Sequence, residues 1–107
     1  MKKMILLVVL SLPVVSLGHA ETLDTAHYVG LSWNAPKPER GETVVAYRVY
    51  RNQWSCQGPW YRRGRSTQAQ FSDAQVVAGD SYFYHVTALD QHGRESKASN
   101  CRKAAIP

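Results

Sequence analysis

The residues best suited to binding chemistry gather in one stretch of the chain. Trp54, Trp60 and Tyr61 flank a turn-rich segment, and arginines follow directly at positions 62 and 63. Aromatic rings interleaved with guanidinium groups suit stacking on sugar rings or a hot-spot contact with another protein. The same rings can instead fold over their own hairpin and stiffen the sheet, so the sequence alone leaves both interpretations open.

No arrangement of residues in the sequence suits catalysis or metal binding. His27, His85 and His92 fall on separate expected elements, and the acidic residues are scattered over loops and turns. A metal site needs several such ligands close together, and acid–base hydrolysis needs a matched pair of carboxylates. We therefore predict a protein that is not an enzyme and that holds no metal and no cofactor.

The first 20 residues follow the three-part pattern of a secretory signal peptide. Lys2 and Lys3 precede a short apolar run, and small residues, Gly18 and Ala20, come before the expected cut. The apolar run is shorter than the roughly 20 residues that a membrane-spanning helix needs. We predict cleavage after Ala20, a leader at 1–20, a secreted or periplasmic domain at 21–107, and no membrane span in the mature chain.

The composition of the mature part excludes one class of partner. Removing Lys2 and Lys3 from the 13 basic residues leaves 11 against 8 acidic ones, so the net charge falls from +5 to +3. This mild excess is not the basic stripe of a nucleic-acid binder. We expect a single small domain with no nucleic-acid partner.

The rest of the chain predicts an all-β fold. Residues 79–90 alternate aromatic and β-branched side chains with a period of two and read as a central antiparallel strand. Further strands are expected at 27–33, 43–51, 61–65, 67–73 and 100–107, with at most a short strand at 21–26. Six or seven short strands between turn signals favour a two-sheet sandwich over a small barrel.

The order of several landmarks resembles the fibronectin type III family, in its short bacterial secreted variety. They include Trp33 in Leu-Ser-Trp, the Tyr-Arg-Val-Tyr-Arg run at 47–51, and the Tyr-x-Tyr-x-Val-x-Ala pattern at 82–88. This resemblance implies a seven-stranded, immunoglobulin-like antiparallel sandwich. One sheet would hold strands A, B and E, and the other strands C′, C, F and G.

The resemblance also assigns structural roles. Tyr82, three residues after Gly79, would form a corner in which its hydroxyl bonds to upstream backbone, with Val76 packed beside its ring. The strand pattern itself places the remaining inward residues, which are Trp33, Tyr47, Val49, Phe71, Tyr84, Val86 and Ala88. Whether Val44 or Val45 also points inward is left open by the pattern.

Two positions depart from the family pattern. Arg102 stands where the last strand usually carries an aliphatic residue, and Arg62 and Arg63 stand where one apolar residue is common. A lone buried arginine costs several kcal/mol unless it is paired. We expect Arg102 to extend toward the sheet edge, unless the register of the last strand differs by one.

Cys56 and Cys101 are the two cysteines of the chain. An even number of cysteines in an exported protein favours a disulfide. The resemblance places Cys56 in the C–C′ loop and Cys101 at the start of strand G, near opposite ends of the fold. An internal bond, an intermolecular bond and capture of a partner therefore all remain open.

These observations favour an exported interaction module. Its partner would be an unidentified protein, met through the outer face of the C′-C-F-G sheet and the loop at 54–60. A cell-wall or extracellular glycan is the alternative partner. The candidate binding residues are Tyr50, Trp54, Trp60, Tyr61, Arg62, Arg63, Phe83 and His85.

Overall fold

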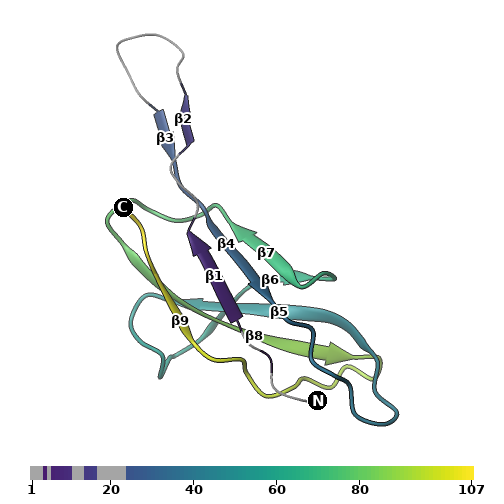
Figure 1. Cartoon of the computed structure of the whole chain (residues 1–107). Coiled ribbons are helices and arrows are strands. Elements are labelled where there is room, and N and C mark those ends of the chain that lie inside the picture. Colours follow the sequence, from purple (N-terminus) through teal and green to yellow (C-terminus); the bar gives the residue numbers. More distant parts are fainter. Residues whose placement is uncertain (1–3, 5, 11–13, 17–23) are drawn as a thin grey trace.

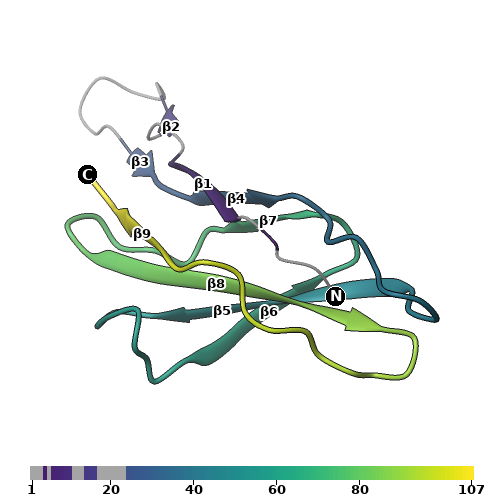
Figure 2. The ribbon, with the colours of Figure 1, turned by 60° about the horizontal axis from the view of Figure 1, so that its bottom comes forward.

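The computed structural model describes residues 4, 6–10, 14–16 and 24–107. The strands are β1 (Leu6–Leu10), β2 (Val14–Ser16), β3 (Asp24–Ala26), β4 (Val29–Trp33), β5 (Val44–Asn52), β6 (Tyr61–Ser66), β7 (Gln70–Asp73), β8 (Ser81–Asp90) and β9 (Arg102–Ala105). A sheet ordered β1-β4-β7 packs against a sheet ordered β6-β5-β8-β9, and all strand pairs are antiparallel (Figures 1 and 2). The predicted all-β sandwich, with its division into two sheets, is confirmed.

Alternating side chains of β4, β5, β8 and β9 build most of the core between the sheets. Val29, Leu31 and Trp33 of β4 are buried, and Tyr47 and Val49 of β5 face them. From β8 come Tyr84, Val86 and Ala88, and from the C-terminal segment Ala104 and Ile106. These are the positions that the two-residue period predicts, because one face of each strand is buried. Phe71 and Val76 lie partly buried against this core.

The start of β5 resolves the ambiguity that the sequence left. A bulge between Val44 and Ala46 shifts the register against β8. Val44 packs against the core, whereas Val45 is exposed. An extra residue in one strand of a pair changes which side chains face inward, so a simple period could not decide between the two valines.

The far end of β8 is buried on both faces, which its alternation did not predict. Thr87 and Leu89, on the outer face, are as inaccessible as the inward residues. The cause is the segment that follows β8 and folds back over it. The amide of Ser96 donates to the carbonyl of Ala88, and Leu89 forms an isolated bridge with Glu95.

The expected tyrosine corner is present. The hydroxyl of Tyr82 accepts a hydrogen bond from the amide of Val77 at 2.9 Å, and the ring is fully buried. Gly79, in the turn between these residues, has φ = +88°. That conformation favours glycine because a side chain would clash with the backbone.

The three-stranded sheet begins earlier in the chain than the sequence predicts. Its edge strand is β1, from the segment that we expect to be a leader, and β3 pairs instead with β2 in a separate hairpin. Removal of residues 1–20 is not tested by this arrangement and stays a prediction. The expected cut after Ala20 lies outside the described residues.

Arg102 lies on the inner side of β9, opposite the inward-facing Tyr84. It pairs with Tyr84 of β8 and is half-buried, two residues before the buried Ala104. Its guanidinium donates to the carbonyl of Leu6 at 3.3 Å. The side chain therefore reaches the rim of the core and finds a polar acceptor there.

Candidate binding surface

Trp54 and Tyr61 form the most exposed aromatic pair among the described residues. Trp54 is 63% exposed and Tyr61 57% exposed, and their ring centroids lie 5.9 Å apart with the planes tilted by 58°. The two rings stand at opposite ends of the β5–β6 connection. They border an open depression lined by Arg51, Asn52, Gln53, Trp54 and Tyr61.

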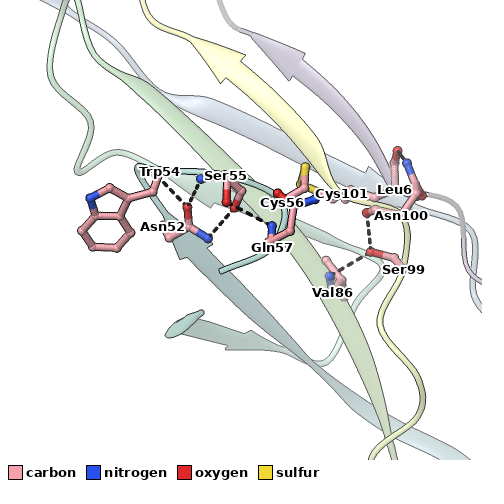
Figure 3. The surroundings of a disulfide bond; sticks show 10 residues. All are labelled: Leu6, Asn52, Trp54, Ser55, Cys56, Gln57, Val86, Ser99, Asn100 and Cys101. Carbon is pink, nitrogen blue, oxygen red and sulfur yellow. Dashed lines mark hydrogen bonds between the residues drawn. A yellow bond between two sulfur atoms is a disulfide. The ribbon is translucent and has the colours of Figure 1, made fainter. Parts of the chain in front are cut away.

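Asn52, the last residue of β5, holds the loop that presents Trp54. Its side-chain oxygen accepts from the amides of Trp54 (2.8 Å) and Ser55 (3.0 Å), and its amide group donates to the carbonyl of Ser55 at 2.9 Å (Figure 3). Asn52 is almost fully buried. The sequence analysis missed this residue, although asparagine is a common turn former that bonds to backbone a few residues further on.

A disulfide fastens the same loop to the far side of the sheet. Cys56 and Cys101 are bonded, with their Cα atoms 5.7 Å apart. Cys101 directly precedes β9, so the loop crosses the outer face of β8 to reach it (Figure 3). Of the alternatives open from the sequence, the internal bond is the one found.

The crossing loop covers part of the face that we expected to bind a partner. The ring centroid of His85 lies 4.1 Å from that of Trp60 and 4.9 Å from that of Tyr50. All three side chains are half-buried. Trp60 therefore folds over the hairpin, and the cross-strand partner of Tyr50 is His85.

Burial and a nearby carboxylate act on His85 in opposite directions. Burial disfavours the charged imidazolium, and the negative charge of Glu95 favours it. Burial is the larger effect, so the pKa of His85 lies below its ordinary value. The imidazole at the centre of this stack is therefore neutral at pH 7.

Glu95 ties the loop after β8 to the outer face of the sheet. Its carboxylate accepts hydrogen bonds from Arg48, Tyr50 and Thr87. Burial alone would raise the pKa of Glu95, but these three donors lower it below the usual range. The hydroxyl of Tyr50 is thus engaged within the protein.

Two of the three arginines of β6, Arg62 and Arg63, have different surroundings. Arg62 is exposed opposite Tyr50 of β5, whereas Arg63 is half-buried and its guanidinium bonds to Asp73 of β7 at 2.9–3.0 Å. The carboxylate of Asp73 is fully buried and also accepts from Arg51 and from the hydroxyl of Tyr84. Arg63 therefore binds a carboxylate in the interior of the fold, whereas Arg62 stays at the surface.

Phe83, the last candidate, lies half-buried on the outer face of β8. The ammonium group of Lys103 sits 5.9 Å from its ring centroid, a distance typical of a cation–π contact. Of the eight candidate residues, the structure thus leaves Trp54 and Tyr61 exposed as a pair, and Arg62 exposed on the other face of β6, opposite Tyr50. Tyr50, Trp60, Phe83 and His85 are partly covered beside them, and Arg63 is turned inward.

The part of the chain that the structure describes holds no cluster of three or more residues that could bind a metal ion. In those same ranges, no helix reaches the length and apolar character required to span a bilayer.

Comparison with solved structures identifies the fold. A Fn3-like protein from Clostridium thermocellum matches with a TM-score of 0.62 and 27% identity, over 75% of this chain and 77% of that one. A pectate lyase from Erwinia chrysanthemi, in complex with tetragalacturonic acid, matches with a TM-score of 0.68 and 19% identity. That match covers 96% of this chain and 28% of the lyase chain. The chain is a fibronectin type III-like domain.

Sequence relatives of this fibronectin type III-like domain are much longer proteins. It is 35% identical over 82 residues to a poly(3-hydroxybutyrate) depolymerase from Ralstonia pickettii, covering 77% of this chain and 14% of the depolymerase. It is 34% identical over 87 residues to exoglucanase B from Cellulomonas fimi, covering 81% of this chain and 7% of the exoglucanase. No protein-family profile matches the chain. The chain therefore corresponds to a short segment of each relative.

Proposed function

We propose that this domain is an exported, non-catalytic interaction module that contacts a protein partner through Trp54 and Tyr61, with Arg51 in the depression beside them. The observation that carries the proposal is the pair of exposed rings on a loop fixed by Asn52 and by the disulfide. Rings held in place before binding lose little conformational entropy when a partner docks.

The composition and shape of this surface favour a protein partner. Tryptophan, tyrosine and arginine are the residues enriched in binding hot spots. The rings of Trp54 and Tyr61 are tilted by 58° and so do not form one flat platform. Tilted rings beside a depression suit a side chain of a partner better than the flat face of a sugar chain.

Export is supported by two independent features. The first 20 residues follow the pattern of a leader that is removed. The Cys56–Cys101 bond suits an oxidising compartment, where disulfides persist. We accordingly place the mature domain in the periplasm or outside the cell.

Crosslinking in the native host tests the protein-partner proposal. Wild-type chain should capture a defined partner, and Trp54→Ala and Tyr61→Ala should each weaken the capture at least about tenfold, the loss expected when a hot-spot ring is truncated. Val45→Ala is the matched control, because Val45 is 44% exposed and lies near the start of β5, at the opposite end of that strand from the β5–β6 connection. Equal capture by all four proteins would reject this surface.

A glycan partner is a second candidate, favoured by the relatives. One of them is an exoglucanase and another is an amylopullulanase. Pull-down on insoluble glucans, with Trp54→Ala and Tyr61→Ala as variants, tests this reading. Binding that both substitutions abolish would favour the glycan, and no retention of the wild type would dismiss it.

A further inference from the structure

The edge strand of the three-stranded sheet comes from the segment that we propose is removed. β1 runs antiparallel to β4 with Leu6 opposite Trp33 and Leu10 opposite Val29. Leu6 is fully buried and Met4 is 3% exposed, and both belong to the hydrophobic core. In this structure β1 thus completes the sandwich as any permanent strand would.

Side chains near the start of β9 hold the other side of β1. The amide of Leu6 donates to the side-chain oxygen of Asn100 at 2.8 Å, and the amide group of Asn100 donates back to the carbonyl of Leu6 at 3.4 Å (Figure 3). Arg102 donates to the same carbonyl. The backbone of Leu6 is therefore bound by side chains in the way that a neighbouring strand would bind it.

Removal of residues 1–20 would take β1 away and leave an open groove beside β4. The amide of Trp33 donates to the carbonyl of Ala69, on the β7 side of β4. Successive amides of a strand point alternately to its two sides. The amides of Gly30 and Ser32 therefore face β1. Without β1 they lose their ladder, and the apolar residues of β4 lose part of their cover. An open edge of this kind is a template for another strand.

The residues next in the chain are poorly suited to replace β1. Residues 21–26 contain one aliphatic residue larger than alanine, whereas Leu6–Leu10 contains five. A second mature copy would offer its own open β4 edge, but Val29, Leu31 and Trp33 of that strand are already buried in its own core and could not fill the groove. The vacated position calls for three apolar side chains at alternate positions, opposite Val29, Leu31 and Trp33.

We propose that, after the leader is removed, the edge of β4 binds an extended apolar segment of a partner protein as an antiparallel strand in the place of β1. Backbone hydrogen bonds to β4 supply the affinity. The apolar floor of the groove selects apolar residues at every second position of the partner strand, as in other strand-addition complexes. Asn100 and Arg102 fix the register by bonding one backbone position of the incoming strand. The inference rests on the export part of the proposed function and not on Trp54 and Tyr61.

The test uses the protein as the exporting host releases it. Mass spectrometry first gives its N-terminus, and a peptide with the sequence of residues 2–11 is then added as the strand donor. We expect amide exchange at Gly30 and Ser32 to slow at least about tenfold, as expected when an open ladder closes. The amide of Leu31, which faces β7, should change much less.

Two controls separate strand addition from non-specific adhesion of an apolar peptide. A peptide carrying Leu7→Pro and Val9→Pro lacks the amides that pair with Ser32 and Gly30, so it should leave exchange unchanged. In the protein, Asn100→Ala should weaken peptide binding about fivefold, the effect of one hydrogen bond. Lys97→Ala, an exposed change in the same loop, should have no effect.

Several results would overturn the proposal. An N-terminus at Met1 would mean that β1 is never vacated. Slow exchange at Gly30 and Ser32 before peptide is added would mean that the chain itself, or a second copy, covers the edge. Equal binding of the proline peptide would mean that no ladder forms. None of these results bears on the Trp54 and Tyr61 variants, so the two proposals fail separately.

Discussion

At the scale of single residues, Tyr82 combines two roles in one side chain. Its ring fills the core below the turn at 77–80, and its hydroxyl satisfies the backbone amide of Val77. The guanidinium of Arg51 lies 4.8 Å from the ring centroid on the other side. The corner therefore joins β8, the preceding turn and β5 through a single aromatic residue.

Replacing Tyr82 by Phe should lower the free energy of unfolding by about 1–2 kcal/mol. The change keeps the ring and removes the acceptor of the partly buried Val77 amide, so the loss is that of about one hydrogen bond. Urea denaturation of the two proteins measures the difference. Tyr61→Phe, a change on an exposed ring, is the control. An equal loss in both variants would contradict the corner.

Asp73 shows what residue types alone do not reveal. It forms a buried cluster with Arg51, Arg63 and Tyr84, which lie 22, 10 and 11 positions away in the sequence. The one signal in the sequence was Arg63, a charged residue where the family carries an apolar one. A buried charge needs a partner, but only the packing of β7 against β5 and β6 shows which carboxylate supplies it.

At the scale of elements, the strands were predictable and the loop at 53–60 was not. Alternation predicted β4, β5 and β8 and their inward residues, because a half-buried strand has a period of two. The path of the loop depends on Cys56 and Trp60 meeting Cys101 and His85, contacts between distant residues that no local pattern encodes. The exposed pair of Trp54 and Tyr61 could therefore be picked out of the eight candidates only from the structure.

β1 was missed for a different physical reason. Leu6–Leu10 is a continuous apolar run, and such a run suits the core of a leader as well as a fully buried strand. The basic residues before it and the small residues after it favoured the leader. The structure shows that the same residues also fit the edge of β4, so one sequence satisfies both patterns.

Removing the disulfide should destabilise the fold and release the loop. For a separation of 45 residues, the chain-entropy relation gives about 4 kcal/mol of lost stability in the Cys56→Ser, Cys101→Ser double variant. Release of Trp60 from His85 should also raise the pKa of His85 toward its ordinary value, since burial is what lowers it. Denaturation and NMR titration measure the two effects.

A matched control for the disulfide variant is Gln57→Ala, an exposed change within the same loop. It should leave both the unfolding free energy and the pKa of His85 near their wild-type values. If the double variant lost stability but the pKa of His85 stayed low, the disulfide would not be what holds Trp60 over the sheet.

At the scale of the whole molecule, charged groups link the elements and make stability depend on pH. The carboxyl groups of Asp73, Asp90 and Glu95 join strands or loops, and each has a lowered pKa. Burial opposes the shift in all three, and hydrogen bonds from arginines, hydroxyls or backbone amides outweigh it. His85 also has a lowered pKa, but there burial is the cause.

Acid should therefore weaken the fold in two steps. Below about pH 6.5, the ordinary pKa of histidine, the unfolded chain binds a proton at His85 that the folded chain resists, so stability falls as pH falls. The carboxyl groups contribute stability above their unfolded pKa of about 4, and that stability is lost as pH falls through their lower folded values. Urea denaturation midpoints measured at about pH 7.5, 5.5 and 3, values that bracket the two steps, give the two losses of stability.

The His85→Gln variant should lose the first step and keep the second. Glutamine does not titrate, whereas Asp73 remains bound to Arg51 and Arg63. A first step that persisted in His85→Gln would place its origin outside the stack of Tyr50, His85 and Trp60.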